Sequence, residues 1–254
     1  MTAASLGILG VGHLATYTIK GLRKSGDQRL VTLSPRNAKT AKMLAEACDC
    51  TIAKTNQTVV DNSDIILLSV RPDSLDTLLA ELSIKPGQLI ISVIAGVSLQ
   101  HLRQHPALKQ ATLVRALPSA SAEICAGPVP LYPANPVAEA LFSCIGKAVV
   151  LESEELFDTA LAHACLHGWS YFLVQELIDW SVNQGMDKET AKTMVAHSIS
   201  SAIAFGESRP ELNYDEIGQS IATPGTYTRK GINHIRDNGG IQSWVEAMDK
   251  TGRL

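Results

Sequence analysis

The chain has 254 residues, of which 45% are hydrophobic and 19% are charged, and its formal net charge is −3. This is the composition of an ordinary globular protein of two domains or one large one, and the charge argues against nucleic acid as a partner. No apolar run approaches the ~20 residues of a membrane helix, and Met1 to Ser5 lack the basic start of a signal peptide. We expect a cytoplasmic protein with no membrane partner.

The five cysteines are odd in number and scattered, at positions 48, 50, 125, 144 and 165. They offer neither a disulfide framework nor the ligand spacing of a zinc site. We expect reduced, mostly buried thiols and no bound metal.

The first predicted element is a strand that runs into Gly10-Val11-Gly12 and then into a helix that reaches Lys24. In a GxGxxA turn, Gly10 permits the tight bend and Gly12 lets the backbone approach a pyrophosphate, while Ala15 is small enough for close packing of helix on strand. The phosphates would lie at the helix N-terminus, where free N–H groups favour anions. The pattern indicates a dinucleotide site, and the alternative is a structural glycine turn.

The second predicted strand, Arg29 to Leu33, ends in Ser34-Pro35-Arg36-Asn37. An NAD enzyme usually carries an acid here for the ribose 2′-hydroxyl, and none occurs between Asp27 and Glu46. Ser34, Arg36 and Lys39 suit a 2′-phosphate instead, so we favour NADP(H) over NAD(H). The alternative is a solvated helix start that Asn37 merely caps.

A βα alternation continues to about Leu151, which predicts a doubly wound, parallel Rossmann sheet. Beyond the two strands above, we predict strands at 51–53, 63–70, 88–94, 112–116, 127–132 and 148–151, and helices at 38–47, 74–82, 99–104 and 137–145. A brief helix or turn holds Asn56. Because strand ends face the cofactor in such sheets, Val70, Arg71 and Pro72 are expected in the site, although Arg71 also suits a surface loop. The cofactor-binding residues that we predict are Gly10, Gly12, His13, Leu14, Ser34, Arg36, Asn56, Val70, Arg71, Pro72 and Ala95.

From Glu152 onward the hydrophobic pattern has a helical period. We therefore predict a dinucleotide-binding domain over residues 1–152 and an all-helical substrate and dimerisation domain over residues 153–254. The predicted helices are 155–166, 169–183, 188–205, 214–221, one that ends near 236, and 241–250. This half is apolar for its size, so we expect a homodimer or a higher homo-oligomer.

The order of motifs resembles the pyrroline-5-carboxylate reductase family, whose members reduce a cyclic imine to proline with NAD(P)H. The segments that carry the resemblance are Gly7 to Ala15 with Gly21-Leu22, Ser63 to Pro72, Ile91 to Ser98, Val114 to Pro118, and Thr223 to Thr228. The resemblance spans nearly the whole chain. It implies a Rossmann domain, a helical dimerisation domain and an active site completed between two subunits.

The departures from the family pattern concentrate on the substrate side. The family's Asn after the two glycines is His13 here, its Lys-Pro is Arg71-Pro72, and its Pro-Asn-Thr-Pro is Pro118 to Ser121. Its substrate-loop run Ser-Gly-Ser-Gly-Pro-Ala-Tyr is Cys165 to Tyr171, where only Gly168 and Tyr171 are kept. The reaction class is therefore predicted more firmly than the substrate.

By the resemblance, Thr228 hydrogen-bonds the imine nitrogen. Gly225, Thr226 and Tyr227 begin a helix and offer N–H groups to a substrate carboxylate, and Tyr171 is assigned to the substrate. The alternative is a capped helix start without a ligand. His167 is a candidate proton donor near neutral pH, or a structural residue on one helix face with His163.

We predict an NADPH-dependent reductase of a cyclic imine acid, with pyrroline-5-carboxylate as the leading substrate. One alternative is another NADP-dependent oxidoreductase on this scaffold, such as a β-hydroxyacid dehydrogenase. Such enzymes need a lysine early in the helical domain, and no lysine occurs between Leu151 and Asp187. A further alternative is a regulatory relative that binds NADP without turnover.

Overall fold

The computed structural model describes residues 3–252 and separates into two compact units. The division falls between Leu161 and Ala162, inside the long helix α7 (Leu156–Asn183). The sequence places the boundary at residue 152, where the strands end. The division into a cofactor domain and a substrate domain at this residue stays a prediction. The first turn of α7 contacts the sheet, since the Phe157 ring lies 4.4 Å from the guanidinium carbon of Arg115 on β6.

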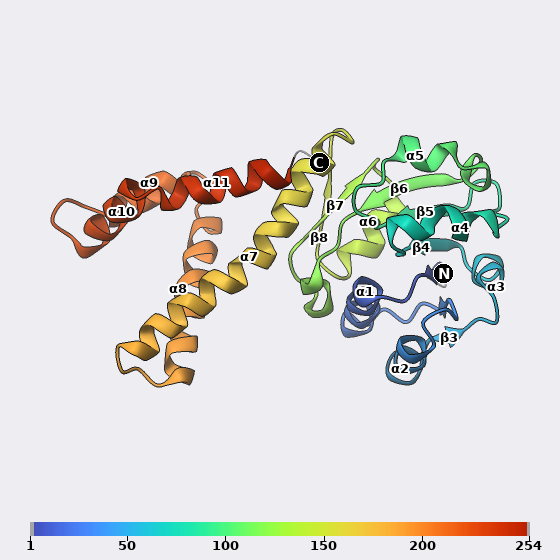
Figure 1. Ribbon diagram of the computed structural model, residues 1–254, viewed down its shortest axis with the longest axis horizontal. Coiled ribbons are helices and arrows are strands. Elements are labelled where there is room, and N and C mark those ends of the chain that lie inside the picture. The colour runs from blue at the N-terminus through green and yellow to red at the C-terminus, as the bar shows by residue number, and fades with distance from the viewer. Residues whose placement is uncertain (1–2, 253–254) are drawn as a thin grey trace. The chain divides into compact units, whose positions relative to one another are not determined.

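The first unit is an eight-stranded sheet in the order β3-β2-β1-β4-β5-β6-β7-β8 (Figure 1). The strands are β1 (Leu6–Leu9), β2 (Val31–Leu33), β3 (Thr51–Ile52), β4 (Ile65–Leu68), β5 (Leu89–Ser92), β6 (Thr112–Ala116), β7 (Pro128–Tyr132) and β8 (Lys147–Val150). The first six strands are parallel to one another, as predicted. In contrast, β7 pairs antiparallel with β6, and β8 pairs parallel with β7, so both run opposite to the other six. An apolar run gives no strand direction, so the sequence could not show this reversal.

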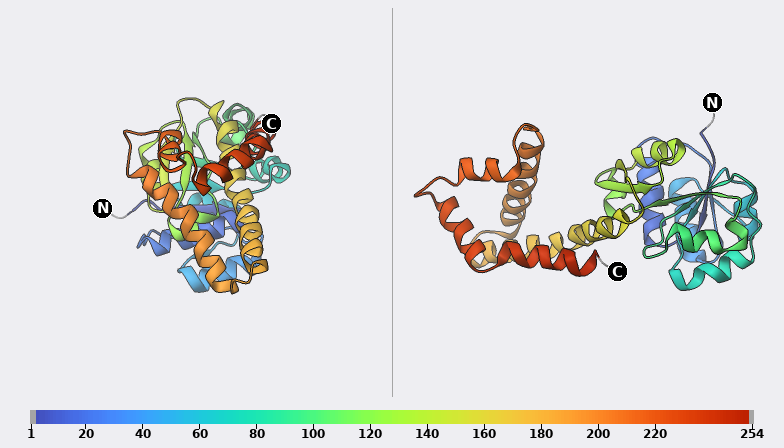
Figure 2. Two further views of the ribbon diagram at one scale, coloured as in Figure 1. Left: turned by 90° about the vertical axis from the view of Figure 1, so that its left-hand side faces the viewer. Right: turned by 90° about the horizontal axis from the view of Figure 1, so that it is seen from above.

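Helices cover both faces of this sheet (Figures 1 and 2). One face packs against α1 (His13–Lys24), α2 (Ala38–Cys48) and α6 (Pro136–Ser143), and the other against α3 (Asn56–Asp61), α4 (Leu75–Ala80) and α5 (Leu99–Gln104). Along β4 the buried residues alternate: Ile65 and Leu67 join the first layer, and Ile66 and Leu68 the second. The uninterrupted apolar strand is thus explained by burial on both faces.

Close packing of α1 depends on small residues. Ala15 is fully buried against the sheet. Gly21 lies against a 3₁₀ turn, Ala120–Ile124, where a Cβ atom would collide with the carbonyl oxygen of Ala122. The sequence pattern did not predict this turn, which also joins α1 through the ion pair of Lys20 with Glu123, at 2.9 Å.

The second unit consists of the remainder of α7 with α8 (Lys188–Glu207), α9 (Tyr214–Ile221), α10 (Tyr227–Asp237) and α11 (Gly240–Thr251). The prediction of separate helices at 155–166 and 169–183 is wrong, because α7 continues through Gly168. A single glycine costs a helix about 1 kcal/mol and does not end it without a cap or a proline.

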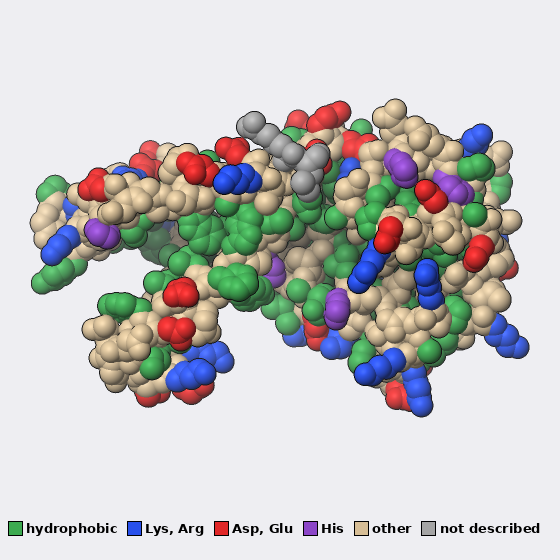
Figure 3. Space-filling view, viewed as in Figure 1, with side chains coloured by type: hydrophobic (Ala, Val, Ile, Leu, Met, Phe, Trp, Pro, Cys, Tyr) green, Lys and Arg blue, Asp and Glu red, His purple; other side chains and the backbone are tan. Residues whose placement is uncertain are grey.

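Many large apolar side chains of the second unit lie at its surface, as Figure 3 shows. Phe172 is 75% exposed and Trp180 is 64% exposed. Patches of this kind mark interaction surfaces. Within residues 3–252, no helix is long and apolar enough to cross a membrane.

Candidate active site

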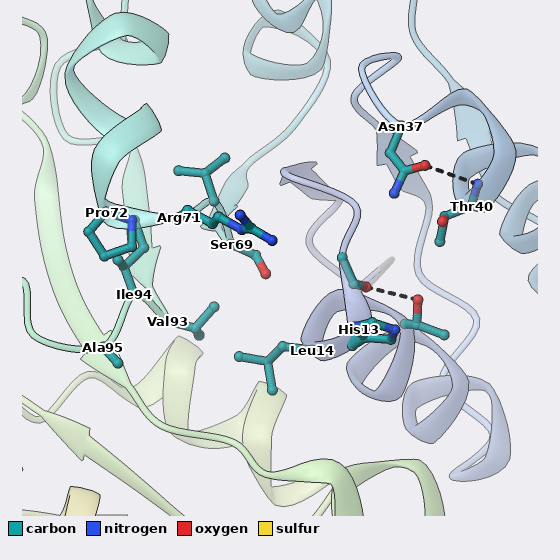
Figure 4. A pocket seen from close by; sticks show the side chains of 13 residues that line it. His13, Leu14, Asn37, Thr40, Ser69, Arg71, Pro72, Val93, Ile94 and Ala95 are labelled. Carbon is teal, nitrogen blue, oxygen red and sulfur yellow. Dashed lines mark hydrogen bonds between the residues drawn. The ribbon is translucent and has the colours of Figure 1, made fainter.

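A cavity of about 590 Å³ lies at the carboxyl ends of the parallel strands, where β1 separates β2 from β4. Connections leave the sheet in opposite directions at this point, which is where open α/β sheets bind ligands. The cavity is lined by Gly12, His13, Leu14, Thr16, Asn37, Thr40, Ser69, Val70, Arg71, Pro72, Val93, Ile94 and Ala95 (Figure 4). Seven predicted cofactor residues are among them.

The two glycines of the turn have different structural tasks. Gly10 has φ +99°, and a Cβ atom there would lie 2.5 Å from the carbonyl oxygen of Ser69 at the end of β4. Gly12 has φ −102°, and a Cβ atom there would meet nothing within 4 Å. Gly10 is therefore required by the fold, whereas Gly12 leaves open space at the cavity.

The N-terminus of α1 has no capping side chain, and no acidic residue lies in its first turn. Along α1, the first backbone N–H that donates to the glycine turn is that of Thr16, whose nitrogen lies 3.0 Å from the carbonyl oxygen of Gly12. The preceding N–H groups of His13 and Leu14 are left for a ligand. Together with the helix dipole, they form a site suited to an anion such as a pyrophosphate.

Ser34 and Asn37 hold the turn in place. Ser34 is 2% exposed, and its hydroxyl accepts a hydrogen bond from the N–H of Gly10 at 3.1 Å. Ser34 thus has a structural role in the turn, and its contact with a 2′-phosphate stays a prediction. Asn37 caps α2 through Thr40 and donates to the carbonyl oxygen of Val11 at 2.9 Å. The cap was anticipated, but the contact with the turn was not, because it joins residues 26 positions apart.

The charged groups of the cavity favour an anionic ligand. Arg71 extends from the end of β4 toward the side where His13 lies (Figure 4). No lining residue, within the part of the chain that the structure describes, is acidic. Arg36 is exposed in the loop after β2, and Asn56 begins α3; neither lines the cavity.

A buried ion pair that the sequence did not reveal lies beside the end of β5. The guanidinium of Arg115 lies 2.8 Å from the carboxylate of Glu154, which also accepts the N–H of Leu99 at 2.6 Å. Arg115 also lies over the Phe157 ring, 4.4 Å from its centroid. These contacts fix the chain before α7 to the sheet. The pairing joins residues 39 positions apart, and no local pattern predicts it.

The predicted substrate residues Gly225 to Thr228 lie at the start of α10 in the second unit. The N–H of Thr226 bonds to the oxygen of Thr223 at 3.2 Å, and its hydroxyl caps the N–H of Arg229. Thr226 is therefore a capping residue and its N–H is not free for a carboxylate. Thr228 is exposed and lines a separate cavity between α9 and α10.

His167 and Tyr171 are four residues apart on α7, and the structure brings them together. The His167 Nε2 atom lies 3.2 Å from the Tyr171 hydroxyl, and their rings meet edge to face. His163 is exposed on the same helix. Among residues 3–252, no group of three potential metal ligands forms, and all five cysteines are free.

Comparison with known families gives two matches that follow each other along the chain. The family model described as "NADP oxidoreductase coenzyme F420-dependent" matches residues 5–96. The family model described as "Pyrroline-5-carboxylate reductase dimerisation" matches residues 154–253. The first match covers the glycine turn and every residue named as lining the cavity, and the second covers the helical half.

Individual proteins agree with these matches over almost the full chain. Pyrroline-5-carboxylate reductase of Pseudomonas aeruginosa is 27% identical over 94% of this chain and 91% of its own length. The structure of 1-pyrroline-5-carboxylate reductase from Streptococcus pyogenes superimposes with a TM-score of 0.85 at 26% identity, covering 98% of this chain and 97% of that one. Plasmodium falciparum pyrroline carboxylate reductase with NADP bound shares the fold, with a TM-score of 0.86, 19% identity, and coverage of 99% and 97%.

Proposed function

Because the chain belongs to the pyrroline-5-carboxylate reductase family, we propose that it reduces pyrroline-5-carboxylate to proline with NADPH. One hydride and one proton are added across the C=N bond of the cyclic imine, and NADPH becomes NADP⁺. The cofactor supplies the hydride from the C4 atom of its nicotinamide ring. The protein binds both reactants, orients them and excludes water.

The observation that carries the proposal is the anion site at the start of α1. Gly12 presents bare backbone to a large cavity, and the N–H groups of His13 and Leu14 are left unbonded in the first turn of α1. None of the described residues that line the walls carries a carboxylate. A pyrophosphate fits this combination of open space, free donors and positive charge. From there the cavity extends past Arg71 and Pro72 to Ala95 at the end of β5, where we place the nicotinamide end.

We assign the 2′-phosphate of NADPH to the loop after β2. Asn37 and Thr40 line the cavity there, and Arg36 precedes them with an exposed guanidinium. The loop from Ser34 to Thr40 contains no acid that would bind a free ribose hydroxyl and repel a phosphate. Charge-assisted hydrogen bonds from an arginine supply both affinity and preference for NADPH over NADH.

In the second unit, we assign Thr228 to the imine nitrogen and His167 with Tyr171 to the substrate side. Thr228 is exposed at the start of α10, and no described residue hydrogen-bonds its hydroxyl. A cyclic imine is basic enough to be protonated in water, so a hydroxyl that holds the nitrogen suffices without a strong acid.

We further propose that the working form is a homodimer in the cytoplasm. The dimerisation model matches the unit whose apolar side chains are exposed, including Phe172 and Trp180. A second copy of the chain would cover that surface. Reduced thiols, as in all five cysteines of the described residues, agree with a reducing compartment.

The test is NADPH oxidation by the purified protein with a panel of cyclic imines and 2-oxo acids. We expect turnover with pyrroline-5-carboxylate and none with the 2-oxo acids. Turnover of a 2-oxo acid alone would indicate a different oxidoreductase on this scaffold. If the protein binds NADPH but oxidises it with no imine, the proposed reaction is wrong.

A further inference from the structure

Residues 95–98 connect β5 to α5 at the end of the cofactor cavity where we place the nicotinamide ring. Ala95 lines the cavity and is exposed, and Gly96, with φ +73°, is exposed as well. The next two residues join the segment to α5, since Val97 is buried and the hydroxyl of Ser98 caps the helix. The position of Ala95 therefore depends on what holds the start of α5.

A single carboxylate holds the start of α5. The Oε1 atom of Glu154 accepts a hydrogen bond from the N–H of Leu99, the first residue of this helix, at 2.6 Å. The same oxygen accepts a second hydrogen bond from the Arg115 guanidinium on β6, at 2.8 Å. Glu154 thus joins α5, the sheet and the chain that leads into α7.

The charged partner of Glu154 is itself fixed in place. The Arg115 side chain is 9% exposed, and its guanidinium carbon lies 4.4 Å from the centroid of the Phe157 ring. In the sheet, Arg115 pairs with Ser92, the last residue of β5. A guanidinium that is buried, stacked on a ring and hydrogen-bonded has little freedom to move, so it holds the carboxylate of Glu154 in one orientation.

This cluster lies directly behind the wall of the cofactor cavity. Ile94 and Ala95 line the cavity, and they also line a small space of about 10 Å³ whose other walls include Arg115 and Phe157. A space of this size holds at most one water molecule. The close packing leaves Ala95 little room to move away from a bound cofactor.

We propose that Glu154 is a positioning residue, which fixes residues 95–98 and so sets the distance between the nicotinamide C4 atom and the imine carbon. The inference rests on the proposed function, because that function places the nicotinamide ring beside Ala95. Hydride transfer needs the reacting atoms within about 3.5 Å, and a displacement of about 1 Å costs on the order of 100-fold in rate. Cofactor affinity comes instead from the phosphates at the start of α1, in a cavity that Glu154 does not line.

The first test is kinetic. In Glu154→Ala we expect kcat to fall ~10- to 100-fold, while the Kd of NADPH stays within about twofold. With NADPH deuterated at C4, the isotope effect on kcat should increase, because a misaligned hydride transfer limits the rate. Glu154→Gln keeps an acceptor oxygen for the N–H of Leu99 and should retain most of the activity.

The matched control is Glu155→Gln. This neighbouring carboxylate is exposed, and it hydrogen-bonds Ser153 rather than α5 or the sheet. The control variant should change neither kcat, nor the isotope effect, nor the Kd of NADPH.

A second variant separates positioning from folding, because Glu154→Ala leaves a buried charge unpaired. Replacing a buried ion pair by apolar side chains of similar volume is often neutral for stability. The double variant Arg115→Met with Glu154→Met should therefore keep a melting temperature near that of the wild type and still lose kcat as Glu154→Ala does. If it folds and has the wild-type kcat, the inference is wrong.

The fluorescence of bound NADPH separates this inference from the proposed reaction. The reduced nicotinamide ring fluoresces, and ring motion on the nanosecond timescale lowers the anisotropy without any imine present. At saturating protein, the anisotropy should be lower in Glu154→Ala than in the wild type and unchanged in Glu155→Gln. This result supports the inference even if the wild type reduces no imine, which would refute only the reaction. The inference is overturned if Glu154→Ala has the anisotropy and the isotope effect of the wild type.

Discussion

The two halves of the molecule differ in how much of the predicted site each contains. In the first unit, Gly12, His13, Arg71 and their neighbours surround one cavity whose wall is held by buried residues such as Ser34. In the second unit, Thr228 and Tyr171 are exposed, and so are large apolar residues such as Phe172. The cavity that we propose for the cofactor is formed within one unit, whereas the residues that we propose for the substrate belong to a unit whose large apolar side chains are exposed.

The difference has a physical origin in chain connectivity. The cofactor cavity is built from strand ends that hydrogen bonding within one sheet brings together, so a single chain suffices. The second unit, as far as the structure describes it, consists of helices alone, and the large apolar side chains exposed on them suit a further surface. Substitutions of residues that line the cavity of the first unit should therefore act on cofactor binding, and those in the second unit on assembly or turnover.

The largest effect is expected at the glycine turn. Gly10→Val should destabilise the protein by about 3 kcal/mol and abolish NADPH binding, because the positive φ and the nearby Ser69 carbonyl exclude a side chain. Gly12→Val should leave the melting temperature unchanged and weaken NADPH binding ~100-fold, since its side chain would occupy the open space. Thermal unfolding and fluorescence titration measure both. If both variants lower the melting temperature equally, the assignment of Gly10 to folding and of Gly12 to cofactor space is wrong.

Thr228→Ala should lower kcat ~100-fold and leave the Kd of NADPH unchanged, because the hydroxyl belongs to the substrate side. Thr228→Ser keeps the hydroxyl and should retain most of the activity. Steady-state kinetics and cofactor titration measure the two quantities. If Thr228→Ala is as active as the wild type, the residue does not contact the imine.

The double variant Phe172→Glu with Trp180→Glu should convert the oligomer to a monomer, because it places two charges on the apolar surface of α7. NADPH affinity should stay within about twofold, since the cofactor cavity belongs to the other unit. Light scattering measures the mass. Gln175→Glu, an exposed polar position on the same helix, serves as the control and should leave the oligomer intact. An intact oligomer in the double variant would show that this surface is not the interface.

Arg36→Ala should weaken NADPH binding ~10-fold and leave NADH binding unchanged, because only NADPH has the 2′-phosphate. Lys42→Ala removes an exposed charge on α2 and should affect neither. Equal weakening of both cofactors by Arg36→Ala would contradict the assignment.

The structural features that the sequence predicted well are those that depend on residues close together in the chain. The strands through β6, the helix cap at Asn37 and the glycine turn all follow from short patterns, and the structure contains them. What it missed joins distant residues: Asn37 with Val11, Arg115 with Glu154, and Arg229 with Gln219. The uninterrupted α7 was missed for another reason, since Gly168 suggests a break, whereas one glycine without a cap or a proline does not end a helix.

In the proposed reaction, hydride passes from NADPH to the imine carbon of a cyclic imine acid. The direct measurement uses NADPH deuterated at C4 on the transferred face, with pyrroline-5-carboxylate as substrate. We expect proline that is one mass unit heavier by mass spectrometry, with the deuterium on the former imine carbon. Unlabelled proline, or oxidation of the cofactor without proline, would contradict the account.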